Sequence, residues 1–145
     1  MVADCEDYRT VRSLVVHAED VVAAFETNRT PGPRAVLRVT PPFTGRMRAR
    51  LHVDDAEEYL GTPRPLHIDP DLLLDVESLP AYPTAADTED RLRADPDREY
   101  SIERHHEFHT DVVTAWREAA ADAVVSTTEL DGPQGSHRVR VLALG

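Results

Sequence analysis

The 145-residue sequence contains one cysteine, Cys5, and no lysine. A single cysteine cannot form an internal disulfide or a cysteine-based zinc ribbon, which excludes the disulfide-rich secreted class of proteins. No apolar run approaches the roughly 20 residues that a membrane-spanning helix needs. Residues 1–7 have neither a basic nor an apolar stretch, so we expect no signal peptide.

Aromatic residues are also scarce, at 6% of the chain, and glycine and proline (6 and 11 residues) are too few for a low-complexity sequence. A chain of this length can bury a hydrophobic core without support from a metal or a disulfide. We therefore predict one α+β domain over residues 1–145, with a frayed terminus at residues 1–9.

The charged residues comprise 27 acids and 16 bases, all of the bases arginine, for a net charge of −11. Repulsion within such a surface weakens as the Debye length falls to about 3 Å near 1 M salt. The composition is typical of a halophilic protein in a salt-rich cytoplasm, although a GC-rich genome would also replace lysine by arginine. Negative charge opposes binding to anionic membranes, and we predict no membrane partner.

In the N-terminal half, the pattern of apolar residues predicts a strand over residues 10–16 followed by a helix to about Asn28. The alternative is one continuous helix, because the same apolar residues also fit a helical period. The clearest strands are residues 35–40 and 45–53. In the second of these, Met47 and Leu51 are expected to point into the core.

In the C-terminal half, we predict three helices and a β-hairpin. Asp69 and Pro70 are a typical helix start. The predicted helices cover residues 71–78, 85–94 and 96–124, and Asp95 is expected to cap the last of them. The predicted hairpin strands cover residues 125–130 and 137–144 and are joined by a long loop. We therefore expect an α+β fold in which a mostly antiparallel sheet carries one long helix from the C-terminal half and two shorter helices on one face.

One stretch departs from the overall charge: residues 34–53 contain five arginines and no acid. Because side chains alternate along a strand, a hairpin of the two strands would place these arginines on one face. The last predicted strand adds two more with the same spacing. The predicted arginine face consists of Arg34, Arg38, Arg46, Arg48, Arg50, Arg138 and Arg140.

Two interpretations of this face remain open. The arginines can pair with the chain's own acids, namely Asp54, Asp55, Glu57, Glu58 or those in the turn after Asp69, and such exposed pairs contribute only about 0–1 kcal/mol each. Alternatively, the face docks carboxylates or phosphates, which arginine binds in a bidentate manner. The docked partner would be an acidic protein or a nucleic acid. For a single-strand platform, however, the face offers only His52 and Phe43 as aromatic residues, and no nucleic-acid-binding motif occurs.

Three histidines, His105, His106 and His109, cluster on the long predicted helix. His105 and His109 are four residues apart, so both can face one metal ion. Glu103 and His106 have the spacing of carboxylate-bridged di-metal bundles, which need further ligands from other helices. An exposed polar helix face is the alternative. We predict no cofactor, and His105 and His109 are the candidate metal ligands.

No catalytic residue is predicted, and whether the chain is an enzyme is left open. The sequence has no glycine-rich phosphate loop and no nucleophile elbow. Cys5 lies in the terminus that we expect to be frayed, a poor position for a nucleophile. Trp116 has helical spacing with apolar neighbours and is predicted to be a core residue.

Four segments carry a resemblance to a known family: residues 35–53, 65–70, 100–105 and 115–118. Through them the chain resembles small haloarchaeal proteins grouped as a domain of unknown function. The resemblance spans most of the chain and implies a cytoplasmic location, but it implies no chemistry and no site residues.

The leading hypothesis is a halophilic, cytoplasmic, non-catalytic adaptor or regulatory module that binds an acidic protein through the arginine face. One alternative is a nucleic-acid-associated protein that uses the same face. The other is a metal-binding protein or enzyme built on the helix that carries His105, His106 and His109.

Overall fold

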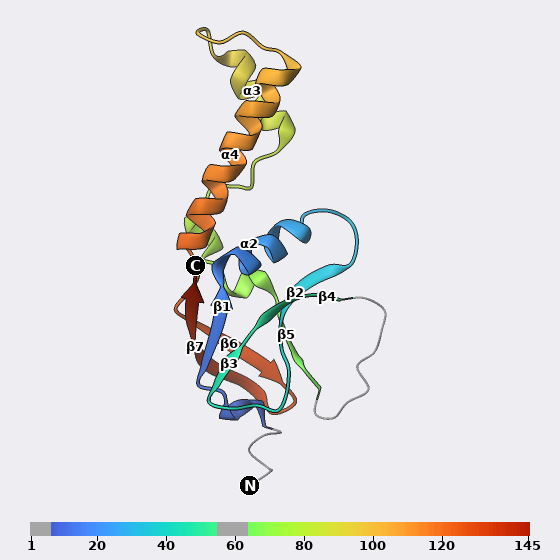
Figure 1. The fold of residues 1–145 in the computed structure, drawn as a ribbon, viewed down its shortest axis with the longest axis vertical. Coiled ribbons are helices and arrows are strands. Elements are labelled where there is room, and N and C mark those ends of the chain that lie inside the picture. Colours follow the sequence, from blue (N-terminus) through green and yellow to red (C-terminus); the bar gives the residue numbers. More distant parts are fainter. Residues whose placement is uncertain (1–6, 55–63) are drawn as a thin grey trace.

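The computed structural model describes residues 7–54 and 64–145. These residues form two β-sheets and three α-helices, which confirms the predicted α+β class (Figure 1). Sheet A has the strand order β3 (Arg46–Arg48), β1 (Ser13–His17), β7 (Gly135–Leu144) and β6 (Thr127–Gly132). Sheet B has the order β4 (Arg50–Asp54), β2 (Arg34–Val39) and β5 (Leu66–Ile68).

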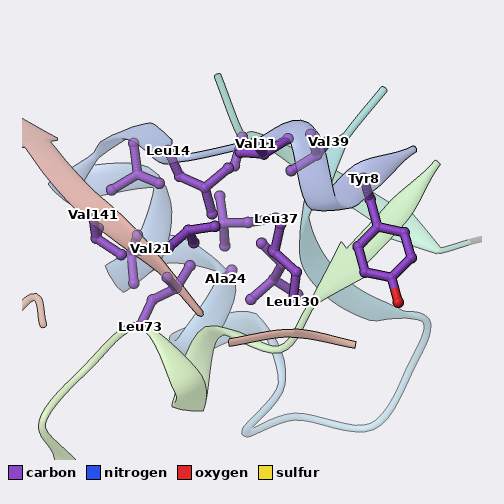
Figure 2. Packing of buried hydrophobic residues seen from close by; sticks show 14 of the residues in the cluster. Tyr8, Val11, Leu14, Val21, Ala24, Leu37, Val39, Leu73, Leu130 and Val141 are labelled. Carbon is purple, nitrogen blue, oxygen red and sulfur yellow. The ribbon is translucent and has the colours of Figure 1, made fainter. Parts of the chain in front are cut away.

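The inner faces of the two sheets share one hydrophobic core (Figure 2). Strand β1 pairs in parallel with β3 and β7, whereas the other strand pairs are antiparallel. Leu14 of sheet A and Leu37 of sheet B are fully buried in this core, with Leu130 alongside. Burial of a side chain of this size stabilises the fold by about 1.5–3 kcal/mol, so the sheets are held together mainly by apolar contact.

The N-terminal segment contains a strand and then a helix, as predicted, and the single-helix alternative is wrong. Leu14 and Val16 alternate inward along β1 and are fully buried. The helix α2 (Ala18–Thr27) follows directly, with Glu19 and Asp20 in its first turn. Acidic residues at this end stabilise a helix because the positive end of its dipole lies there.

The predicted strand over residues 45–53 is divided between the two sheets at Ala49. Ala49 is buried, and its backbone N–H donates to the carbonyl oxygen of Val15 at 3.0 Å. Before this residue, β3 pairs with β1; after it, β4 pairs with β2. Such a bend lets one strand contribute to two packed sheets. Leu51 lies on the same face as its register partner Leu37, the core side, as predicted, but it is 40% exposed because β4 is an edge strand of sheet B.

Helices α3 (Ala85–Ala94) and α4 (Ile102–Asp122) form a helical hairpin that projects from the sheets, and we call this hairpin the arm (Figure 1). The prediction of α3 is confirmed, but this helix packs on α4, so its predicted place on the sheet is wrong. The long helix begins later than predicted, because Ser101 rather than Asp95 caps it: Ser101 Oγ accepts from the Arg104 N–H at 3.0 Å.

The segment that begins at residue 7 is held more firmly than we predicted. Residues 1–6 lie outside the described residues, but Tyr8 is 3% exposed, and its hydroxyl donates to the Gly135 carbonyl oxygen at 2.6 Å. The same hydroxyl accepts from the N–H of Gln134 at 3.0 Å. For residues 7–9 the predicted fraying is therefore wrong, because the ring of Tyr8 packs against the β6–β7 hairpin.

Two further local predictions need correction. The predicted helix over residues 71–78 is instead two short 3-10 turns, Pro70–Leu72 and Val76–Ser78, although Asp69 caps the first as expected. The long loop predicted between the last strands is a two-residue turn at residues 133–134, because β6 and β7 pair as far as Gly132 and Gly135. Within the described ranges, none of the helices has both the length and the hydropathy that a bilayer crossing requires.

Candidate binding surface on the outer face of sheet A

The seven arginines of the predicted face lie on two sheets instead of one. Because the chain changes sheets at Ala49, arginines on either side of this residue belong to different surfaces. The prediction of one continuous seven-arginine surface is therefore wrong. Sheet A carries Arg46, Arg48, Arg138 and Arg140, and sheet B carries Arg34, Arg38 and Arg50.

The register of sheet A arranges its outer side chains in rows across the strands. Arg46 and Arg140 both lie beside Ser13, one on each side of it. In the next row, Arg48 and Leu142 lie on either side of Val15. Because register partners share a face and alternate residues point the same way, these side chains project from the side opposite the core.

The outer surface of sheet A combines cations with exposed apolar groups. Leu142 is 38% exposed and Leu144 is 47% exposed, although both belong to the strand whose inner residues Val139 and Val141 are buried. Exposed apolar side chains next to arginine are more typical of a protein–protein interface than of an ordinary protein surface. We call this surface the arginine–leucine face; it consists of Arg46, Arg48, Arg138, Arg140, Leu142 and Leu144.

The four arginines of this face form no ion pair with any residue in the described ranges. Arg34 behaves differently, because its guanidinium pairs with the carboxylate of Asp69. Pairing with the chain's own acids is thus observed for Arg34. The other acids proposed for this role, Asp55, Glu57 and Glu58, lie outside the described residues, as does the side chain of Asp54.

On sheet B, Arg38 and Arg50 are opposite each other in the register, and His67 lies on the other side of Arg38. Arg38 is half-buried, with Nη1 3.5 Å from Nδ1 of His52. The rings of His52 and His67 have centroids 5.5 Å apart. Sequence reasoning missed this grouping, because His67 comes from a separate strand. Arg38 takes part in contacts within sheet B and does not extend the arginine–leucine face.

The candidate metal ligands on the arm, His105 and His109, both contact the buried hydroxyl of Thr88. Nε2 of His105 and Nδ1 of His109 each lie 2.9 Å from Oγ1 of Thr88, which is fully buried between α3 and α4. His106 is exposed. In the part of the chain that the structure describes, no group of three His, Cys, Asp or Glu side chains is placed to hold a metal ion. The observed contacts join α3 to α4, a role that the spacing of the histidines did not indicate.

A threonine hydroxyl has one proton, so Thr88 can donate to at most one of these two imidazoles. At least one of the histidines must therefore donate its ring N–H to Thr88. Backbone carbonyl oxygens of Thr84 and Ala85 also lie within 3.3 and 3.1 Å of the hydroxyl. Thr88 was not identifiable from the sequence, since it is an ordinary polar residue in a polar helix.

Comparison with curated proteins and with solved structures finds no significant match. A family model, in contrast, matches the chain over residues 1–145. The resemblance to a domain of unknown function is therefore confirmed. The chain belongs to the family described as a domain of unknown function (DUF8009).

Proposed function

We propose that this protein is a non-catalytic binding module that docks an acidic protein on the arginine–leucine face. The observation that carries the proposal is the set of four arginines without an ion pair to any described residue, beside two exposed leucines. In a chain with a net charge of −11, such a surface is a local reversal of charge. It matches a partner surface of carboxylates around an apolar centre.

The leucines decide whether such a surface binds in concentrated salt. At about 1 M salt the Debye length is near 3 Å, so only carboxylates in direct contact with an arginine still attract it. Each exposed pair then contributes about 0–1 kcal/mol. The free energy gained by burying Leu142 and Leu144 is not screened by salt. At about 25 cal/mol per Å² of buried apolar area, it is comparable to the contribution of the ion pairs. Binding is therefore expected to persist in molar salt.

The composition supports a salt-rich cytoplasm as the place where the protein works. An excess of acids with arginine as the only basic residue suits a surface that is screened by concentrated salt. As part of this proposal, we place the protein in the cytoplasm of a haloarchaeon.

A nucleic acid fits the arginine–leucine face less well than an acidic protein does. The register rows of this face contain Ser13, Val15 and the leucines, and the aromatic ring they include is the imidazole of His17 beside Leu144, so rings do not alternate with the arginines as in a base-stacking platform. Counterion release, the main source of affinity for phosphate backbones, is also weak in concentrated salt. A nucleic-acid partner is therefore treated as an outcome that would contradict the proposal.

The test is capture from a cell extract in molar salt, followed by binding measurements with the purified partner. The variant Arg48→Gln/Arg140→Gln removes two cations from the face. The control Arg93→Gln/Arg104→Gln makes the same change of charge on the arm. Loss of two exposed ion pairs should weaken binding severalfold, up to about thirtyfold, whereas the control should bind as the wild type does.

Two results would contradict the proposal. One is an acidic partner that binds the Arg48→Gln/Arg140→Gln variant as tightly as the control. The other is a bound fraction that disappears after nuclease treatment, which would make a nucleic acid the partner. A second variant, Leu142→Ser, should weaken binding more in molar salt than in dilute buffer, with Ile102→Ser on the arm as its control, since Ile102 is 81% exposed.

A further inference from the structure

The arm contains an apolar groove that the proposed function does not use. It lies between α3, α4 and residues 80–83, and has a volume of about 690 Å³. This volume is within the range of small-molecule ligand pockets, about 300–1,000 Å³. Its walls are mostly apolar and include Pro80, Pro83, Val112, Ala115, Trp116 and Ala119.

A second hollow of about 590 Å³ adjoins the groove, since Pro80 and Ala119 line both. The two hollows therefore lie side by side along the C-terminal half of α4. Ala115 and Ala119 are four residues apart on the exposed side of this helix. Small side chains at this spacing leave room for another helix to approach closely.

The charged side chains that line these hollows, which we call the rim, are almost all acidic. Asp87 and Asp90 line the first hollow, and Asp75 and Asp122 line the second. None of these four carboxylates forms an ion pair with any residue in the described ranges. The one basic side chain in these walls, Arg91, lies over the ring of Phe108, with its guanidinium carbon 5.2 Å from the ring centroid.

From this combination we propose that the groove binds a basic amphipathic helix of a partner protein. Apolar residues on one face of that helix would occupy the floor formed by Val112, Ala115 and Ala119. Its basic residues would lie beside Asp87 and Asp90. This is the mode in which an amphipathic helix occupies an apolar groove, with anchors at helical spacing, and the negative rim selects a basic helix over an acidic one.

This inference goes beyond the proposed function and does not depend on it. The groove is negative and apolar, whereas the arginine–leucine face is positive, so the two surfaces would recognise partners of opposite charge. A module with both surfaces can hold an acidic protein and a basic segment at the same time.

Trp116 makes the groove accessible to a direct measurement. It is the only tryptophan in the chain and lines the groove, so its fluorescence reports on this site. The probe is a synthetic amphipathic helix with leucines on one face and arginines on the other. The comparison peptide has the same leucines and has glutamates in place of the arginines. Calorimetric titration provides a second measurement that does not depend on Trp116.

We expect the basic peptide to change the Trp116 emission and to bind about tenfold tighter than the acidic peptide, since two exposed ion pairs form in one case and two repulsions in the other. Ala119→Arg places a bulky cation on the floor and should abolish binding. Thr114→Arg adds the same charge to another face of α4 and should leave binding unchanged. Both sites are exposed, so both variants should fold.

The role of the rim is tested by neutralising charge. Asp87→Asn/Asp90→Asn should weaken binding of the basic peptide severalfold, whereas Glu103→Gln/Glu107→Gln, elsewhere on the arm, should not. The inference is overturned if neither peptide binds the folded wild type, if both bind equally, or if Ala119→Arg binds as tightly as Thr114→Arg. Because none of these variants changes the arginine–leucine face, failure here leaves the proposed function standing, and the reverse also holds.

Discussion

Glu26 and Arg117 lie 91 residues apart in the sequence, yet Nε of Arg117 donates to both carboxylate oxygens of Glu26, at 2.9 and 3.0 Å. The hydroxyl of Tyr82 donates to the same carboxylate. The side chain of Glu26 is only 18% exposed. One carboxylate therefore joins α2, α4 and the segment before α3 at the base of the arm.

The first prediction concerns this junction. Glu26→Ala removes the acceptor of two donors, one of them the partly buried hydroxyl of Tyr82, and should lower the free energy of unfolding by about 1–3 kcal/mol. Urea unfolding measures the change. Glu118→Ala removes an exposed carboxylate of α4 and should alter stability by less than about 0.5 kcal/mol. Equal losses in the two variants would show that the junction does not stabilise the fold.

The second prediction is a dependence on alkaline pH. Burial, and then the hydrogen bond to Glu26, raises the pKa of Tyr82 above its usual range. The folded protein thus keeps the Tyr82 proton at a pH where the unfolded chain has lost it. The resulting stability is fully present below about pH 10, the ordinary tyrosine pKa, and is lost as the pH rises through the raised value.

Tyr82→Phe should therefore be less stable than the wild type at neutral pH by about 1 kcal/mol, from loss of the hydrogen bond. Since phenylalanine does not ionise, this difference should shrink above about pH 10. Denaturant unfolding at neutral and alkaline pH measures it. A difference that stays constant or widens at high pH would contradict the assignment.

The third prediction follows from the contact between Tyr8 and Gly132. A Cβ at position 132 would overlap the Cε1 and Cζ atoms of the Tyr8 ring. Gly132→Ala should cost about 1–3 kcal/mol, because the buried ring must move. At Gly45 an added Cβ meets no heavy atom within 4 Å, so Gly45→Ala should change stability by less than about 0.5 kcal/mol. Thermal unfolding of both variants tests this, and a neutral Gly132→Ala would refute the packing of Tyr8.

The fourth prediction concerns Thr88 in the arm. Thr88→Val keeps the shape of the side chain but removes the hydroxyl that contacts His105 and His109, and should cost about 1–3 kcal/mol. Thr114→Val, an exposed change on α4, provides the comparison and should be close to neutral. Thermal unfolding measures both. If the two variants melt together, the hydroxyl contacts do not hold α3 on α4.

The fifth prediction separates the two sheets. Arg48 and Arg50 are two residues apart, but Arg48 belongs to sheet A and Arg50 to sheet B. Under the proposed function, Arg48→Gln should weaken binding of the acidic partner severalfold, whereas Arg50→Gln should not. Titration with the purified partner decides it. Equal losses would favour a surface that continues around both sheets.

Much of the local structure was predictable from neighbouring residues. The alternation of Leu14 and Val16 along β1 and the acids at the start of α2 identify a strand followed by a helix. Likewise, Thr84 caps α3 at the start that we predicted. These features depend on residues a few positions apart, so their signal lies within a short window of sequence.

The arginine–leucine face shows where such prediction ends. Alternation alone determined that Arg46, Arg48 and Arg50 point away from the core, and this holds whether one sheet or two are present. The assignment of Arg50 to a different surface depends on the pairing of Ala49 with Val15, a contact between distant segments. Periodicity describes one strand and carries no information about which strand becomes its partner.

By itself, then, the amino-acid sequence determined the acidic, lysine-free character of the chain, its α+β class and the positions of most strands and helices. Only the tertiary structure determined three further features. These are the division of the arginines between two sheets, the burial of Tyr8 and Thr88, and the junction at Glu26. Each of these depends on groups brought together from remote parts of the chain, where burial and hydrogen bonding set the outcome and local preference is weak.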